Sequence, residues 1–174
     1  GTASQTLMAD GSVSLNQSKH YIGEEYGDGI VFFTYDNGLH GLIASKADQS
    51  TGVRWSASNS KTYARSFGLN GGAKNTILII ANQGNIDGNT FAARLCSEYY
   101  TYTTYLTNNN SLSLSDWYLP AIEELAKLWE QKNVVGGFSN TDYWSSTESS
   151  TDDNAWYVNF AQTSWSISGN TKNA

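Results

Sequence analysis

The segment LPAIEELAKLWEQKN, residues 119–133, has the strongest helical pattern in this sequence. Its apolar side chains recur every three or four residues, so that one helix face carries Ile122, Leu125, Leu128 and Trp129. Pro120 suits the first helical position, where its missing N–H costs nothing. Glu123 and Lys127 are four residues apart and can pair across one turn. Because the glycines at 136–137 end the pattern, we expect an amphipathic helix with one face in a core.

Three short aromatic segments follow this helix and are typical of β-strands. They are DYWSST at 142–147, AWYVNF at 155–160 and SWSIS at 164–168. Alternate residues of a strand point to opposite faces. We therefore expect one alternating set of the middle segment to lie in the core, together with the aromatic residues of the first: Trp156, Val158, Phe160, Tyr143 and Trp144.

Two strand-like runs lie near the start of the chain, GIVFFTY at 29–35 and HGLIAS at 40–45. The residues between them include Asp36, Asn37 and Gly38, which can take the positive φ angles that a tight hairpin needs. This part of the sequence predicts an antiparallel hairpin.

The central part of the chain has weaker patterns. Residues 46–75 are rich in Ser, Asn and Gly without a sustained period, so we expect a long loop. The run TILIIA at 76–81 indicates either a buried strand or the start of a helix. Residues 90–100 repeat large apolar side chains every four positions and predict a helix, with Asn89 or Thr90 as its cap.

Together these elements predict an α+β fold, with two main helices packed on short antiparallel strands and long loops. A chain of 174 residues indicates one domain, which we place at 21–174 after a flexible, polar lead-in at 1–20. The lone Cys96 excludes an internal disulfide, and its apolar setting predicts a buried thiol. No apolar run reaches the roughly 18 residues of a membrane-spanning helix, so we expect no membrane insertion.

The charged residues are segregated along the chain. The net charge of −6 disfavours a nucleic-acid partner, and we expect none. However, no acidic residue occurs between Asp48 and Asp87. The bases of this region and of the following helix are Arg54, Lys61, Arg65, Lys74 and Arg94. Such cations can bind sulfate groups, because salt screens remote carboxylates over about 8 Å. The alternative is a set of ordinary solvated charges, with Arg54 stacked on Trp55 or paired internally.

The loop ESSTDDN gathers three carboxylates in a short stretch: Glu148, Asp152 and Asp153. Clustered carboxylates and backbone carbonyls are the ligands that calcium prefers. We therefore consider a divalent cation site, for Ca²⁺ or Mg²⁺, although the order of an EF-hand loop is missing. The alternative is a solvated loop between two strands, and no cofactor is required.

Enzymatic patterns are weak in this chain. The two histidines, His20 and His40, have no spacing that suggests a zinc site. Neither a G-x-S-x-G motif nor a phosphate-binding loop with its lysine occurs, so we expect no enzyme. The tyrosines of EYYTYTTYL are candidates for stacking on neutral sugars or for a subunit interface, while the ordinary expectation for each is packing or surface filling: Tyr99, Tyr100, Tyr102 and Tyr105.

Three motifs carry a family resemblance. DWYLPAIEEL, YWSSTE and AWYVNF, in this order, resemble the C-terminal domain of the Legionella collagen-like adhesin, Lcl, and its relatives. The stretch from Tyr21 to Trp55 resembles the start of the same domain, so that similar segments cover most of residues 21–165. The resemblance implies a C-type-lectin-like fold and an extracellular domain on the bacterial cell surface, carried as a homotrimer by a collagen-like stalk.

The same resemblance implies binding of sulfated glycosaminoglycans on host cells, with divalent cations promoting aggregation. The basic residues named above are then the expected binding set. Two alternatives stay open. One is a trimerisation cap for the stalk that binds nothing, and the other is a calcium-dependent lectin for neutral glycans, whose E-P-N or Q-P-D tripeptide is missing here.

Overall fold

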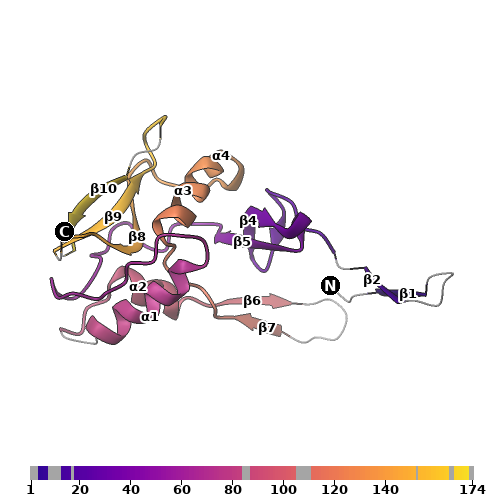
Figure 1. Ribbon diagram of the computed structural model, residues 1–174, viewed down its shortest axis with the longest axis horizontal. Helices are drawn as coiled ribbons and strands as arrows, with labels where there is room; N and C mark the ends of the chain where they lie inside the picture. Colours follow the sequence, from indigo (N-terminus) through magenta and orange to yellow (C-terminus); the bar gives the residue numbers. More distant parts are fainter. Residues whose placement is uncertain are drawn as a thin grey trace.

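The computed structural model describes residues 4–7, 13–16, 18–83, 87–104, 111–151, 153–164 and 167–172. Within these ranges, helices combine with small antiparallel sheets, which confirms the α+β class (Figure 1). Figure 1 shows the C-terminal strands and the helices at one end of the molecule and the first strand pair at the other.

The predicted hairpin at the start of the domain is confirmed. Strand β4 (Gly29–Tyr35) pairs with β5 (His40–Ser45), and β3 (Glu25–Tyr26) adds to the other edge of β4. The connecting 3-10 turn η1 (Asp36–Gly38) has φ angles of 50°, 57° and 85°. Gly38 is required there, because a Cβ atom would lie 2.7 Å from the His20 carbonyl oxygen.

The C-terminal sheet has the order β10-β9-β8, all antiparallel. Its strands are β8 (Asp142–Glu148), β9 (Asn154–Asn159) and β10 (Ile167–Thr171). Val158 and Phe160 are buried as predicted, whereas Trp156 is only partly buried and Ala155, from the opposite face, is fully buried. The central strand β9 is covered on both faces, so alternation alone could not select its core residues. The third predicted segment began at 164, and residues 165–166 lie outside the described ranges.

The predicted amphipathic helix is α3 (Ile122–Glu130), followed by the short α4 (Lys132–Val135). Its buried apolar residues include Ile122, Leu125 and Leu128, as the periodicity predicted, and Trp129 packs partly buried against the same core. Two details of the prediction are wrong. Ala121 is the N-cap, so Pro120 lies before the helix, and Lys127 pairs with Glu130 at 3.0 Å rather than with Glu123.

In the central region, the helical alternative for TILIIA is confirmed and the buried strand is wrong. The run TILIIA lies inside α1 (Gly71–Gln83), so the long loop ends before Gly71. Several residues on the buried side of α1 are polar, namely Asn75, Thr76 and Gln83, which explains the weak apolar period. The next helix, α2 (Ala92–Glu98), was predicted, but its N-cap is Phe91 rather than Asn89 or Thr90.

Two further strand pairs extend from the body of the molecule (Figure 1). They are β1 (Ser4–Leu7) with β2 (Val13–Asn16) and β6 (Thr101–Thr104) with β7 (Ser111–Leu114). The lead-in expected at 1–20 thus contains a pair of strands. Of the candidate tyrosines, Tyr105 and the side chain of Tyr102 lie outside the described structure, while Tyr99 packs edge-on against Trp117.

The buried apolar residues form two clusters. One lies between α1, α2 and the loop around Trp55, and the other lies between α3, β4 and β9. Cys96 packs partly buried against the first cluster, and its burial raises the pKa of the thiol to about 12. The prediction of a buried thiol is therefore confirmed only in part, because Cys96 keeps some exposed surface.

Candidate functional site

The segment from Lys61 to Phe67 has an alternating pattern of exposure beside α1. Thr62 and Ala64 are fully buried. The residues on the outer side of the segment, which we call the exposed row, are Lys61, Tyr63, Arg65 and Phe67. The side chains of this row thus alternate between cationic and aromatic.

Helix α1 holds this segment through polar side chains. The Asn75 side chain accepts from the Ser66 N–H at 3.0 Å and donates to the Ser66 carbonyl at 2.8 Å. Further along the helix, on nearly the same face, the Asn82 side-chain amide donates to the Thr62 carbonyl at 3.2 Å. The two asparagines are two helical turns apart, so α1 runs alongside the segment. Backbone groups that would pair in a sheet pair here with side chains.

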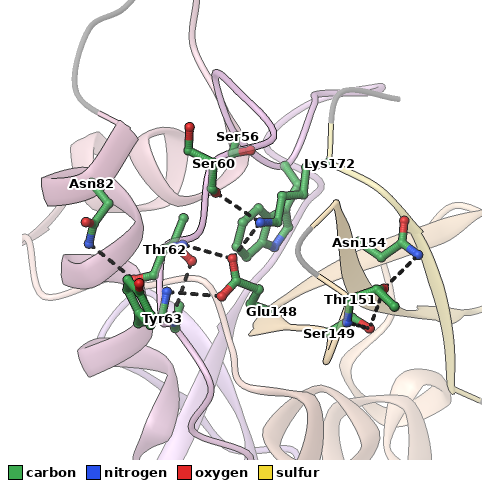
Figure 2. A network of polar contacts seen from close by, with 12 residues as sticks. Ser56, Ser60, Thr62, Tyr63, Asn82, Glu148, Ser149, Thr151, Asn154 and Lys172 are labelled. Carbon is green, nitrogen blue, oxygen red and sulfur yellow. Dashed lines mark hydrogen bonds and ion pairs between the residues drawn. The ribbon is translucent and has the colours of Figure 1, made fainter.

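Glu148, the last residue of β8, anchors the middle of the segment. Its carboxylate accepts hydrogen bonds from the Thr62 N–H at 2.8 Å and the Tyr63 N–H at 3.0 Å (Figure 2). Lys172 Nζ donates to the same carboxylate at 2.5 Å, and both side chains have an exposed fraction of 0 %. The Arg65 Nε atom lies 3.5 Å from the second carboxylate oxygen. Glu148 thus holds the segment from beneath.

Lys172 connects the end of the chain to this segment. Its Nζ also donates to the Ser60 carbonyl at 3.1 Å and lies 5.2 Å from the centre of the Trp55 ring. Its backbone N–H donates to the Asp153 backbone carbonyl, and its own carbonyl accepts from the Trp55 backbone N–H, each at 2.9 Å. The buried ammonium group therefore has a carboxylate, a carbonyl and an aromatic face as partners.

The contacts of Glu148 keep its carboxyl group ionised. Burial by itself would raise the pKa of this group, but the Lys172 ammonium and the Thr62 and Tyr63 N–H groups act in the opposite direction. The net result is a pKa below the ordinary glutamate value.

Tyr63 has an unusual backbone conformation within the exposed row. Its φ angle is 60°, in the left-handed region that favours glycine and asparagine. The Arg65 N–H donates to the Tyr63 carbonyl at 2.9 Å and closes a tight turn. The exposed fraction of Tyr63 is 64 % and that of Phe67 is 50 %. Two aromatic rings are therefore presented to solvent beside two cationic side chains.

The five predicted basic residues do not share one kind of surrounding, and Arg54 has an acidic partner of its own. Arg54 makes a bidentate contact with Asp87 at 2.6 Å and 2.5 Å and also donates to the Thr90 and Asn89 carbonyls. This salt bridge holds the pKa of Asp87 well below its usual range and raises that of Arg54. The alternative of internal pairing is therefore correct for Arg54.

The remaining bases have different surroundings. Arg94 donates to Glu98, four residues later on α2, at 2.7 Å. Lys61 and Arg65 belong to the exposed row, and each also has polar or charged contacts within the protein. Lys74 is exposed on α1, one residue before Asn75, and has no polar partner among the described residues. Lys61 and Arg65 thus share the exposed row, and Lys74 is exposed on the helix whose next residue, Asn75, holds Ser66 of the same segment.

The predicted carboxylate cluster is not assembled in the described part of the structure. Glu148 faces inward to Lys172, while Asp153 is exposed and Asp152 lies outside the described residues. No group of three or more His, Cys, Asp or Glu residues in the described ranges could hold a metal ion. The geometry argues against Glu148 as a cation ligand, because its oxygens already accept from several donors.

The sequence analysis missed Tyr63, Phe67 and Lys172. The alternation in KTYARSF was a signal for the two aromatic residues, because a period of two places Lys, Tyr, Arg and Phe on one side. No local signal identifies Lys172, because its partner Glu148 is 24 residues away in the sequence.

Comparisons with known proteins identify the family of this chain. The family described as the Lcl C-terminal domain matches residues 45–174, most of the chain. The match starts after the stretch 21–44, which the sequence analysis had included in the resemblance. A search of curated proteins gives no match. Among the described residues, no helix has both the length and the apolar character needed to cross a bilayer. The chain belongs to the Lcl C-terminal domain family, an adhesin-type domain family and not a family of enzymes.

Proposed function

We propose that this bacterial adhesin-related domain binds sulfated glycosaminoglycans, without catalysis, through the exposed row and Lys74. One observation carries the proposal: exposed cations and exposed aromatic rings alternate along a segment whose inner side is anchored to the core. A sulfated polysaccharide presents anions and ring faces in alternation, so it can contact both kinds of side chain.

The anchoring of the segment supports binding as well as folding. Glu148 and Asn75 hold the backbone of the segment before any ligand arrives. A segment that is already ordered loses less conformational freedom on binding than a flexible loop does.

Local charge balance supports the same site despite the net charge of −6. The Glu148 carboxylate, which lies 3.5 Å from Arg65 Nε, is compensated by Lys172. Glu123 lies beside Gly68 and sets an acidic limit at the far end of the row. Exposed charges beyond about 8 Å are largely screened at physiological salt. Arg54 and Arg94 are left out of the proposed binding set because each forms a salt bridge, with Asp87 and Glu98 respectively.

The assembly belongs to the proposal as well. A homotrimeric, C-type-lectin-like domain at the bacterial cell surface would present several copies of the row to one polymer. Such multivalency raises the overall avidity for the polymer, although each single site still binds weakly. Divalent cations would promote aggregation of cells or copies rather than hold the glycan.

The test is retention on immobilised heparin over a salt gradient. The triple variant Lys61→Ala, Arg65→Ala, Lys74→Ala should elute at lower salt than the wild-type chain, and its salt dependence should fall by about two to three counterions by analogy with phosphate contacts. The matched control replaces Lys19, Lys46 and Lys127 by Ala, so that both triple variants have the same net charge. Equal elution of the two triple variants contradicts the site, and loss of wild-type retention in EDTA contradicts the role given to cations.

A further inference from the structure

We propose that Tyr63 is the sugar-ring contact of the site, its phenol ring lying on the face of a pyranose ring whose sulfate groups are held by Lys61 and Arg65. The inference rests on the proposed function and deepens it, because it assigns recognition of the sugar itself to a residue that is not charged.

The backbone of Tyr63 is the first reason. A φ angle of 60° brings Cβ close to the neighbouring carbonyl oxygen, a cost that glycine avoids and asparagine tolerates. Residues in such conformations gather at binding sites when the surrounding structure holds them there. The Glu148 carboxylate accepts from the N–H of Tyr63, and the turn bond from Arg65 to its carbonyl holds the other side.

The exposure of the ring is the second reason. Aromatic rings contribute most to stability when they are buried, yet 64 % of Tyr63 is accessible to solvent. The neighbours Thr62 and Ala64 fill the core positions of this segment and are fully buried. The left-handed conformation therefore belongs to a residue that is mainly exposed, while its neighbours fill the core positions.

The neighbours of the ring identify the class of ligand. Lys61 and Arg65, two residues to either side, are exposed cations. A pyranose ring has faces of C–H groups with slight positive character, which match the negative face of an aromatic ring. Its sulfate substituents are anions for the flanking ammonium and guanidinium groups. A polyanion without sugar rings can pair with Lys61 and Arg65 but offers no ring face to Tyr63.

The experiment compares two probes, a heparin oligosaccharide and inorganic polyphosphate, against one variant series. Tyr63→Asn removes the ring and keeps a residue that tolerates the backbone conformation. It should weaken heparin binding about tenfold, the size of effect found for one stacking aromatic in nucleic-acid binding. Polyphosphate binding should stay within about twofold, since the cations are intact. Tyr63→Phe should bind both probes like the wild type.

The matched control is Tyr21→Asn, because Tyr21 is 66 % exposed and lies outside the row. It should leave both probes unaffected. Unchanged heparin binding by Tyr63→Asn, or an equal loss on both probes, overturns the ring contact while the triple lysine–arginine variant still tests the site. A wild-type chain that binds polyphosphate but no heparin overturns the ring contact and the proposed function together.

Discussion

Lys172 Nζ donates a hydrogen bond of 2.5 Å to the Glu148 carboxylate, and neither side chain is accessible to solvent. This pair joins the residue after β10 to the last residue of β8, which anchors the exposed row. Its members have further partners: Thr62 and Tyr63 N–H groups for the carboxylate, and the Ser60 carbonyl and Trp55 ring for the ammonium. Such complete pairing is what allows two charges to be buried.

Removing one member of the pair should destabilise the fold strongly. Glu148→Gln leaves the Lys172 ammonium buried without a counter-charge, and we expect a loss of about 3–5 kcal/mol in the free energy of unfolding. Urea denaturation followed by tryptophan fluorescence measures it.

The double variant Glu148→Gln, Lys172→Met removes both charges and should be more stable than the sum of the two single effects predicts. A coupling of at least about 1 kcal/mol is expected for side chains in direct contact. Strict additivity of the single variants contradicts the role of the pair.

Acid should weaken the contribution of Glu148. Its pKa is lower in the folded protein than in the unfolded chain, because the Lys172 and backbone contacts outweigh the effect of burial. The unfolded chain therefore binds more protons as the pH falls below the ordinary glutamate pKa, and stability is lost. The difference in unfolding free energy between the wild type and Glu148→Gln should shrink from about pH 5 to about pH 3. Titration of Asp87 and Glu124 affects the stability of both proteins equally and cancels in this difference. A difference that stays constant over this pH range contradicts the lowered pKa of Glu148.

Gly72 in α1 should not tolerate a methyl group. A Cβ atom there would lie 2.5 Å from Glu124 Oε2 and 2.6 Å from a Tyr118 ring carbon. Glu124 cannot retreat easily, since it accepts from the N–H groups of Asn70 and Ala121 at 2.7 Å each. Gly72→Ala should cost about 1–3 kcal/mol by thermal or urea unfolding. The control Gly52→Ala has no atom within 4 Å of its Cβ and should change stability by less than about 0.5 kcal/mol.

Tyr63→Gly should keep or raise the stability of the fold. The left-handed conformation costs about 1–2 kcal/mol for residues other than glycine, and Tyr63→Gly removes this cost. The greater freedom of glycine in the unfolded chain lowers the stability by about 0.5–1 kcal/mol. The expected net change is between zero and about 1 kcal/mol of stabilisation, measured by differential scanning calorimetry. A loss above about 1 kcal/mol indicates that the ring packs in the fold.

Several elements were determined by the sequence because their causes are local. Asp36, Asn37 and Gly38 are residue types that readily take the positive φ angles of a tight turn, so the hairpin of β4 and β5 was predictable from its local sequence. The apolar stripe of α3 depends only on spacing along one helix, and it correctly identified the buried Ile122 and Leu125. The order of the three family motifs is likewise a property of the chain alone.

The tertiary structure decided what depends on contacts across the chain. Polar residues such as Asn75 could be buried in α1 only because Ser66 offers both of its backbone groups to that side chain. Glu148 looked like part of an acidic loop, but its backbone partner Thr62 is 86 residues away and its counter-charge Lys172 is near the other end. The physical reason is that a charge or amide is stable in the interior only when its partners arrive from distant segments, and a sequence pattern contains no information on those distances.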